Sequence, residues 1–260
     1  MMEVRRQLYN VERQEEIRRF VEERQRVTIS DICEQFVVSE ATARRDLDAL
    51  VEQNKIRRVH GGAIAISLPL PDLPVMQRST EQVEEKRRIG IEAAKLVADG
   101  DTVFLGGGTT VLEVARNLVN RRNLTVITNS QHVINLLSEI REITLICLGG
   151  MLRHGEGSFI GHLAEQSLSE LRADRVIIGI RSIDPERGLT NDHLPETMTD
   201  RAILQIGREV IIVADHTKCG GVSAALVAPV KAIHVLVTDR GTSPEFVKAL
   251  ENKGIRVCVV

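Results

Sequence analysis

Residues 38–47 read Val-Ser-Glu-Ala-Thr-Ala-Arg-Arg-Asp-Leu, and this stretch indicates how the N-terminal region folds. Ser39 is suited to be an N-cap, because its hydroxyl can accept a hydrogen bond from an orphan N–H of the first helical turn. At about 100° per residue, Ala43 and Leu47 fall on one side of the predicted helix and Arg45 falls nearly opposite. The outward face is small and cationic near its N-terminal end, which is typical of a helix that enters the major groove of DNA.

The residues that follow favour DNA binding over an ordinary solvated helix. The alternative interpretation is that Arg44 and Arg45 simply pair with Asp48 along the helix. However, a hairpin-like stretch over residues 56–64 carries several cations just before a Gly-Gly pair, as the wing of a winged helix-turn-helix does. The predicted DNA contacts are Ser39, Ala41, Thr42, Arg44, Arg45, Arg57, Arg58 and His60.

Helical periodicity also precedes this stretch. Apolar residues at i, i+3 and i+4 predict a first helix around Ile17, and a short second helix is expected after Ser30. The third helix is expected to run from Ser39 to about Val51. This arrangement completes the three helices that a winged helix-turn-helix requires.

A change in composition at residues 67–74 indicates a domain boundary. This segment reads Ser-Leu-Pro-Leu-Pro-Asp-Leu-Pro. Three of the chain's seven prolines fall there, and proline fixes φ and removes a backbone donor. We therefore predict a DNA-binding domain over 1–66, a stiff extended linker over 67–78 and a second domain over 79–260.

After the linker, short apolar runs alternate with helical stretches. Such continuous apolar runs predict a buried, mostly parallel sheet with helices on both faces, and therefore an α/β domain. The expected strands are Thr102–Leu105, Leu124–Thr128, Ile143–Leu148, Arg175–Ile180, Val210–Ala214, Ile233–Thr238 and Arg256–Val259.

A glycine-rich turn follows the first of these strands. Gly106, Gly107, Gly108, Thr109 and Thr110 lead from the strand into a helix. Glycines let a ligand approach the backbone, and a helix N-terminus attracts anions. No Lys follows in the position that a Walker A loop requires, and Val111 occupies the place of the third glycine of a dinucleotide-binding loop. A tight strand–helix turn without a ligand is the alternative.

Polar residues also follow other strands, at the edge where ligands of open α/β sheets bind. Taken singly, each one fits a helix cap, a turn or a surface pair; taken together, they favour a phosphate site at this edge. The predicted effector-binding residues are Gly106, Gly107, Gly108, Thr109, Thr110, Thr128, Asn129, Ser130, Asp184, Asp215 and Lys218.

Composition excludes several other functions. One Tyr, five Phe and no Trp are too few for base-stacking platforms, and a formal net charge of −2 argues against a nonspecific nucleic-acid coat. The four cysteines form no CxxC pair and the histidines lack metal-ligand spacing, so we expect no metal and no cofactor. The first twenty residues have no apolar signal region and no apolar run is long enough to span a membrane, which predicts a cytoplasmic protein.

Two stretches near the N-terminus, VSEATARRDL and RVHGGA, resemble the winged helix-turn-helix of the DeoR family of bacterial transcription regulators. Two residues depart from the family pattern. Val37 stands where the family often has Gly, and a β-branched residue takes φ > 0 only at a cost, so we expect a different turn there. Ala43 replaces a larger aliphatic residue, so we expect looser packing under the third helix.

The rest of the chain, from about Glu81 onward, resembles the DeoR effector domain in the segments GDTVFLGGGTT, TVITNS, LGGMLR, DPERGLT and VADHTK. That domain is similar in fold to ribose-5-phosphate isomerase. The segment VADHTK resembles the Asp-x-x-Lys motif at the end of a strand in that enzyme. The resemblance implies operator DNA and a phosphorylated sugar or related metabolite as partners, repression, and a homo-oligomer. Arg181-Ser182 replaces a pair found in many members, which would add a guanidinium beside the pocket.

The leading hypothesis is thus a transcription repressor of carbohydrate-metabolism genes that responds to a phosphorylated sugar, and not an enzyme. A sugar-phosphate isomerase with an accessory N-terminal domain is the alternative from another class, and a CoA-transferase-like protein is a third. An isomerase would have no need of the winged-helix motif, and only one carboxylate–lysine pair is convincing.

Overall fold

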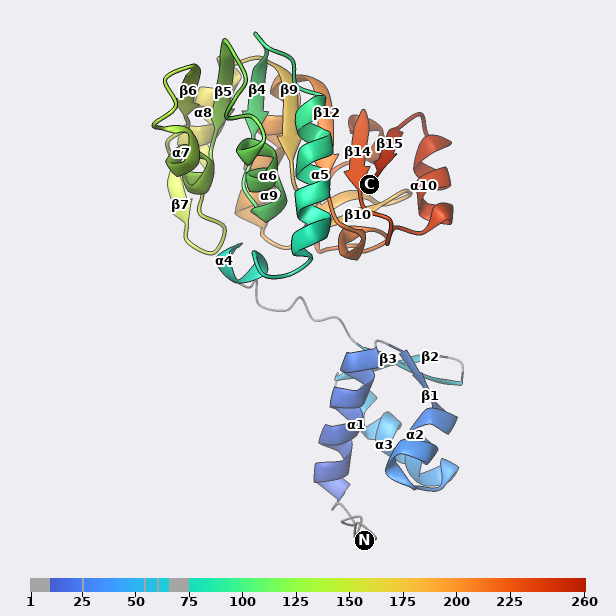
Figure 1. Cartoon of the computed structure of the whole chain (residues 1–260). Helices are drawn as coiled ribbons and strands as arrows, with labels where there is room; N and C mark the ends of the chain where they lie inside the picture. The colour runs from blue at the N-terminus through green and yellow to red at the C-terminus, as the bar shows by residue number, and fades with distance from the viewer. Residues whose placement is uncertain (1–9, 25, 54, 60, 66–74) are drawn as a thin grey trace, which may run out of the picture. The chain divides into compact units, whose positions relative to one another are not determined.

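The computed structural model describes residues 10–24, 26–53, 55–59, 61–65 and 75–260, and it divides the chain into two compact units, residues 1–70 and 71–260 (Figure 1). Among the helices in these described ranges, none combines the length and the apolar character that crossing a membrane requires.

The N-terminal unit has three helices and a small antiparallel sheet. Its elements are α1 (Asn10–Arg24), β1 (Arg26–Thr28), α2 (Ile29–Phe36), α3 (Glu40–Glu52), β2 (Ile56–Val59) and β3 (Gly62–Ala65). The strands lie in the order β1-β3-β2, so β1 adds a strand to the predicted hairpin. Ile17, Ile32, Leu47 and Leu50 are fully buried where the three helices meet.

The ends of α2 differ from the sequence expectation. The helix begins two residues earlier than Ser30 implied, because Thr28 is its N-cap and forms a capping box with Asp31. At the other end, Val37 adopts φ 52° and ψ 50°, the left-handed conformation that its β-branched side chain was expected to avoid. The expectation of a different turn is therefore wrong. Ala43 is fully buried, like the larger core residues around it.

Gly62 is required by the close approach of β1 to the hairpin. A Cβ at this position would lie 2.0 Å from the carbonyl oxygen of Val27. Because that atom belongs to the backbone of a paired strand, it cannot move aside without breaking the β1–β3 ladder. The second glycine of the RVHGGA stretch therefore serves the fold of the wing.

The C-terminal unit contains a seven-stranded sheet in the order β15-β14-β12-β9-β4-β5-β6, with every neighbouring pair parallel. These are the strands expected from the apolar runs, so the predicted α/β fold is confirmed. They are β4 (Thr102–Leu105), β5 (Leu124–Thr128), β6 (Ile143–Cys147), β9 (Ala173–Ile178), β12 (Gly207–Val213), β14 (Val235–Thr238) and β15 (Arg256–Val259).

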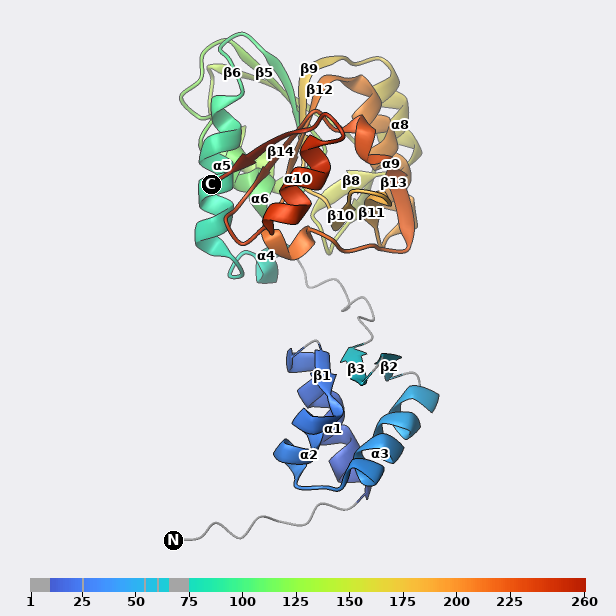
Figure 2. The same ribbon diagram turned by 90° about the vertical axis from the view of Figure 1, so that its right-hand side faces the viewer.

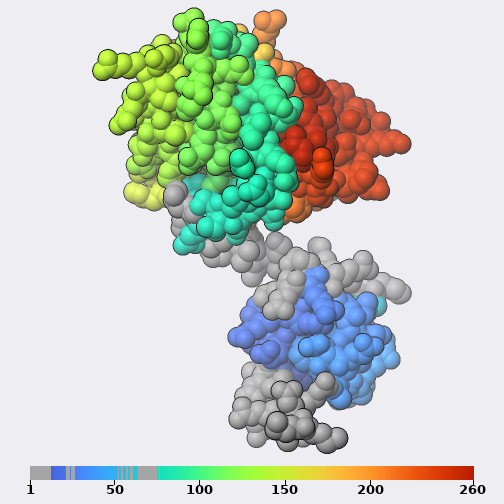
Figure 3. All heavy atoms as spheres, in the orientation of Figure 1, coloured from blue at the N-terminus to red at the C-terminus, as the bar shows by residue number. Residues whose placement is uncertain are grey.

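Helices cover both faces of this sheet (Figures 1 and 2). The helices of one face are α5 (Val83–Lys95), α6 (Thr109–Arg116) and α7 (Gln131–Leu137). The other face packs against α8 (His162–Ser169), α9 (Leu194–Ile206) and α10 (Pro244–Glu251). In the space-filling view, the surface of α5 (teal) lies between the green α6–α7 region and the red C-terminal residues (Figure 3).

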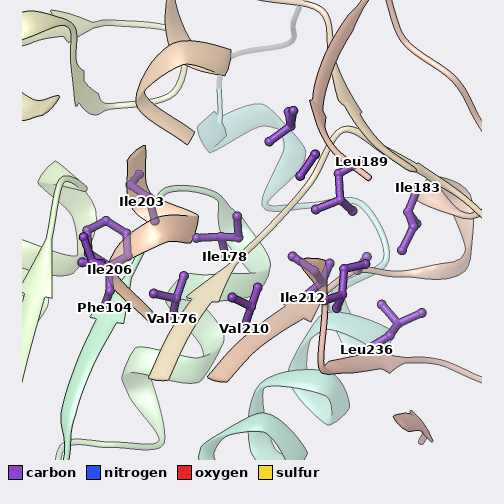
Figure 4. Close-up of a cluster of buried hydrophobic side chains, with 14 of the residues drawn as sticks. Phe104, Val176, Ile178, Ile183, Leu189, Ile203, Ile206, Val210, Ile212 and Leu236 are labelled. Atoms are coloured by element: carbon purple, nitrogen blue, oxygen red, sulfur yellow. The ribbon is translucent and has the colours of Figure 1, made fainter. Parts of the chain in front are cut away.

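Alternate strand residues fill the two cores, as a two-faced buried sheet requires. Figure 4 shows Phe104 and Val176 on the α9 side of the sheet, beside Ile203 and Ile206. The neighbouring Val103 faces α5 and α6 instead.

Short strands outside the main sheet were not predicted from the sequence. A three-stranded sheet joins β10 (Ser182–Asp184), β11 (Gly188–Asn191) and β13 (Ala225–Ala228), and a hairpin joins β7 (Met151–Arg153) to β8 (Ser158–Ile160). Two single turns of 3₁₀ helix, at His216–Lys218 and Val230–Ala232, complete the unit.

The segment expected to be an extended linker, 67–78, differs in the part that is described. Its last four residues form the short helix α4 (Val75–Arg78). Val75 is buried, and its N–H donates to the carbonyl of Gly155 at 2.7 Å. These residues are therefore packed into the C-terminal unit, whereas residues 66–74 lie outside the described ranges.

Candidate functional site

The third helix presents the predicted DNA-contact residues to solvent. Ser39 is the N-cap of α3, as expected, and its hydroxyl accepts from the Thr42 N–H at 3.3 Å. Ala41, Arg44 and Arg45 are exposed. Arg44 pairs with Glu40 one turn before it, and no ion pair is recorded between Arg45 and any other described residue. The outward face of α3 thus carries an available guanidinium.

The wing lies against α3 through one ion pair. Nε of Arg58, on β2, lies 3.5 Å from Oδ1 of Asp48, so Asp48 pairs across to the wing and not along its own helix. Arg57 occupies the preceding position of β2, where its backbone pairs with Ile64. The predicted contact His60 lies outside the described residues.

Asp46 is the aspartate of the VSEATARRDL stretch, and it holds α1 against α3. It is 2% exposed, and Nε of Arg13 donates to its Oδ2 at 2.7 Å. Nη2 of Arg13 and Nε2 of Gln14 donate to its other oxygen at 3.2 and 3.3 Å. Hydrogen bonds to Asp46 raise the pKa of the Arg13 guanidinium. Asp46 therefore stabilises the domain and is not free to contact DNA.

The C-terminal unit contains a cavity of about 540 Å³ at the carboxyl ends of its parallel strands. The loops after β4, β5, β9 and β12 all contribute to its lining. The chain continues from β4 to β5 on one side, whereas β9 lies on the other side of β4. The cavity thus lies at the point where the strand order reverses, which is where ligands bind in open α/β sheets.

One wall of the cavity is the predicted glycine-rich turn, Gly106–Thr110. Gly108 adopts φ 101°, a conformation that favours glycine, and is the N-cap of α6. No described side chain caps this helix end. The first N–H groups of α6 therefore present a partial positive charge to the cavity, suited to an anion.

Two lysines add positive charge beside this turn. Lys218 lines the cavity, and no side-chain hydrogen bond is recorded between it and the rest of the described chain. Lys86 is buried, and its ammonium donates to the carbonyls of Arg78 and Glu81 at 2.6 Å each. Burial lowers the pKa of both lysines. An anionic ligand would raise the pKa of each ammonium again, because it adds an opposite charge nearby.

Not all the predicted effector residues reach the cavity. Gly106–Thr110, Asn129, Asp215 and Lys218 line it, whereas Thr128, Ser130 and Asp184 do not. The Thr128 hydroxyl donates to the Leu105 carbonyl at 2.6 Å, and Ser130 caps α7. Asp184 accepts from two backbone N–H groups of the β10–β11 turn, at 2.8 and 2.7 Å. The structure thus gives these three residues local structural roles in place of the expected ligand contact.

Asp215 also differs in its availability. It is 2% exposed, and its Oδ1 accepts from both the N–H and the hydroxyl of Thr217. This oxygen is therefore committed to the loop, which leaves Oδ2 as the atom of Asp215 that can face a ligand.

A group of three carboxylates, absent from the sequence prediction, also lines the cavity and is called the carboxylate wall. Glu196 and Asp200 lie one turn apart on α9, and Glu156 follows β7. Glu156 pairs with Arg78, and Glu196 pairs with Arg153. Burial, with a contribution from Glu196, raises the pKa of Asp200 to about 8. The sequence signal was an i, i+4 acidic pair continuing the stripe that holds the buried Ile203.

Two arginines also line the cavity. Arg78, from α4, lies at its edge, and its buried Nε has no hydrogen-bond partner among the described atoms. Arg181 follows β9, and its Nε donates to Asp192 at 2.9 Å. The guanidinium expected beside the pocket from the sequence is therefore present.

Comparisons with known proteins agree with both units. Residues 13–68 match the model of the DeoR-like helix-turn-helix domain, and residues 81–240 match that of the DeoR C terminal sensor domain. The transcriptional repressor AccR of Agrobacterium fabrum is 37% identical over 232 residues, which cover 89% of this chain and 90% of that protein. The HTH-type transcriptional repressor GlcR of Bacillus subtilis is 36% identical, over 97% of each chain. The glycerol-3-phosphate regulon repressor of Escherichia coli is 37% identical, over 82% of this chain and 84% of that protein.

Similarity to solved structures is weaker. Ribose 5-phosphate isomerase A from Methanocaldococcus jannaschii is 21% identical, with a TM-score of 0.40, over 54% of this chain and 55% of that one. The match spans about half of the isomerase and indicates nothing about the activity of this chain. The two domain matches and the near-full-length relatives, by contrast, show that the chain belongs to the DeoR family of transcription regulators, with a DNA-binding helix-turn-helix domain and a sensor domain for a small molecule.

Proposed function

We propose that this protein represses genes of carbohydrate metabolism and that a phosphorylated sugar or related metabolite controls its binding to operator DNA. Three relatives are named as repressors, and the name of one refers to glycerol 3-phosphate. We further propose that it acts as a homo-oligomer of at least two chains, in the cytoplasm, where a bacterial operator is found. The proposed domains are 1–66 and 79–260; of the linker predicted at 67–78, the described end Val75–Arg78 belongs to the second domain as α4.

The proposed DNA interface is the outward face of α3 together with the wing. Arg45 would contact base edges in the major groove, since it is exposed and available, and Ala41 beside it lets the backbone approach. Arg57 and Arg58 would contact phosphates from the wing. The wider proposed set is Ser39, Ala41, Thr42, Arg44, Arg45, Arg57, Arg58 and His60.

The observation that carries the effector proposal is the N-terminus of α6, which lacks a side-chain cap and faces the cavity beside Lys218. The N–H groups of the glycine-rich turn, with the hydroxyls of Thr109 and Thr110, would donate to phosphate oxygens. Lys218 would neutralise the charge of the phosphate. Asn129 and Asp215 are the other predicted residues that remain candidates for ligand contact.

The proposed route from the cavity to the linker is α4. Arg78 is the last residue of this helix, and its ion pair with Glu156 is largely buried. A phosphate in the cavity would compete with Glu156 for the Arg78 guanidinium, because an anion with two charges attracts it more strongly. A shift of Arg78 would move α4, which follows the linker directly. Coupling between two such sites is typically about 1–3 kcal/mol, or roughly 5–150-fold in affinity for DNA.

The test has two stages. Thermal-shift screening of the full chain against phosphorylated sugars should identify a ligand that raises the melting temperature. Lys218→Ala, or Thr109→Ala combined with Thr110→Ala, should then leave ligand-free operator binding intact and abolish the response to that ligand. Asp184→Ala is the matched control, because Asp184 lies outside the cavity. A normal response from the Lys218 variant would contradict this site.

The same preparation separates this proposal from an isomerase. Turnover of a sugar phosphate by the wild-type protein at enzymatic rates would overturn it. We expect no turnover, because one oxygen of Asp215 is held by Thr217 and the relatives are named as regulators.

A further inference from the structure

The carboxylate wall of the cavity, formed by Glu156, Glu196 and Asp200, has more acids than cations in direct contact with it. Arg78 pairs with Glu156, and Arg153 pairs with Glu196. Among the described residues, no ion pair is recorded for the third acid, Asp200. Two guanidinium groups thus balance the charge of two carboxylates, and no cationic partner of Asp200 is recorded among the described residues.

The atoms of Glu196 are fully engaged, whereas Asp200 keeps one free oxygen. The Ser158 hydroxyl donates to Oε1 of Glu196 at 3.1 Å, and Arg153 donates to Oε2. Asn191 donates to Oε2 of Glu196 at 3.3 Å and to Oδ2 of Asp200 at 3.0 Å. Asp200 lines the cavity, and within the described chain no bond is recorded to its Oδ1.

Asp200 is therefore suited to donate a hydrogen bond. Burial and the neighbouring Glu196 raise its pKa to about 8, so its carboxyl is protonated at neutral pH. A protonated carboxyl has one O–H donor. Since Oδ2 accepts from Asn191, the proton belongs on Oδ1, the oxygen with no recorded bond.

A second unsatisfied atom lies on the same side. Asn129 is 3% exposed and lines the cavity, and its Nδ2 donates to the Phe159 carbonyl at 3.0 Å. Its Oδ1 has no hydrogen-bond partner among the described atoms. Phe159 follows Ser158, which contacts Glu196, so Asn129 adjoins the carboxylate wall. A buried acceptor without a partner costs free energy unless a water or a ligand donates to it.

A ligand group that both donates and accepts hydrogen bonds can satisfy both of these atoms. A phosphate dianion accepts only, so it cannot satisfy Oδ1 of Asn129. An ammonium donates only, so it cannot accept from Asp200. A hydroxyl does both, and it carries no charge to disturb a wall that is already neutral.

We propose that Asn129 and Asp200 bind hydroxyl groups of the effector, with Asp200 as a hydrogen-bond donor, and that the effector is a monophosphorylated polyhydroxy compound whose phosphate lies at α6. This inference rests on the proposed function and adds to it the orientation of the ligand and the residues that recognise its uncharged end. Asp200 is thereby a specificity residue on α9, outside the segments where the sequence placed the site.

The test is isothermal titration calorimetry of the full chain at pH 7 with phosphate monoesters of equal charge. The probes are ethyl phosphate, which has no hydroxyl group, glycerol 3-phosphate, and a panel of pentose 5-phosphates and hexose 6-phosphates. For wild type, we expect at least one polyhydroxy probe to bind about 10-fold or more tightly than ethyl phosphate, from one or two added hydrogen bonds. Asp200→Ala should remove about 10-fold of that preference and change ethyl phosphate affinity by less than about 2-fold.

Asp200→Asn is the conservative variant, because its amide keeps a donor in the same place without a titrating group. We expect it to retain the preference within about 3-fold. Asp184→Ala, which removes a carboxylate that is not part of the cavity lining, should behave as wild type. If Asp200→Ala weakens ethyl phosphate and polyhydroxy probes equally, or weakens neither, the role assigned to Asp200 is wrong.

A pH series gives an independent readout. Glu196, Glu156 and Arg153 are the charged groups that face Asp200, and Lys86 and Lys218 titrate elsewhere in the cavity. Dividing each affinity by that of ethyl phosphate cancels the effect of the two lysines. The wild-type preference should fall between pH 7 and pH 9 as Asp200 ionises, and that of Asp200→Asn should stay constant.

The outcomes also separate this inference from the proposed function. If no phosphate ester binds to the wild-type protein, both are overturned. If the esters bind but Asp200→Ala leaves the hydroxyl preference intact, only the hydroxyl-binding role is overturned and the phosphate site stands.

Discussion

Val37→Gly should stabilise the DNA-binding unit. Val37 ends α2 with φ 52° and ψ 50°, and its side chain is 67% exposed. A β-branched residue in this conformation is strained, because its Cβ crowds the following carbonyl oxygen. Glycine adopts the same φ and ψ without that crowding.

The expected gain follows from three opposing effects. Relief of the left-handed strain contributes about 1–3 kcal/mol. The greater entropy of glycine in the unfolded chain takes back about 0.4–1 kcal/mol. Loss of the side chain costs about 0.5 kcal/mol, since only a third of it is buried and full burial of Val is worth about 1.5 kcal/mol. The net expectation is about 1 kcal/mol, or a rise in melting temperature of about 4–8 °C for a domain of this size.

Differential scanning calorimetry of the full chain, followed through the transition of the N-terminal unit, measures the effect. Gln53→Gly is the matched control: Gln53 is the exposed C-cap of α3, but its φ is −79°, so glycine brings no relief. We expect the control to lower stability by about 0.5–1 kcal/mol. If Val37→Gly lowers the melting temperature as the control does, the strain argument is refuted.

Three further predictions concern function and pH. Arg45→Ala should weaken specific operator binding by about 1–3 kcal/mol in a titration at fixed salt, without unfolding the domain, because Arg45 is exposed; unchanged affinity would contradict its role in the groove. Arg58→Ala should reduce the slope of log K against log salt by about one, with little change in sequence preference, and an unaltered slope would remove Arg58 from the phosphate contacts. Asp200→Asn should gain stability over wild type as pH rises, because the folded-state pKa of Asp200, about 8, exceeds its unfolded value. Between pH 5 and pH 8 the wild type should lose up to about 4 kcal/mol of unfolding free energy, and the variant should not. Urea unfolding at each pH measures the difference. A stability difference that stays constant with pH would show that Asp200 is ionised throughout.

The main sheet was predictable because its strands are buried on both faces. Runs such as Thr102–Leu105 and Val235–Thr238 are apolar throughout, and their burial leaves little room for another interpretation. The third helix was equally predictable from the sequence, because Ser39 caps it and Ala43 and Leu47 mark its buried side.

The wall of the site was not predictable in the same way. Glu196 and Asp200 on α9 look like an exposed acidic pair until the fold places them against Asn191 and Arg153. The residues that follow strands line only part of the cavity, because helices and short hairpins supply the rest of its lining. Polar residues after a strand, such as Thr128 and Asp184, were over-assigned to the ligand because capping a turn needs the same residue types.

The place of α4 sets where a chimeric biosensor can be joined. A foreign DNA-binding domain fused at residue 79 would discard Val75–Arg78. That fusion would remove the guanidinium that neutralises Glu156 and the Arg78 carbonyl that holds the Lys86 ammonium. Glu156 would lose its cationic partner, and Lys86 would keep only the Glu81 carbonyl of its two acceptors. A fusion junction before Val75 keeps α4 and the cavity together. The DNA-binding domain can then be replaced by another domain with a different DNA specificity.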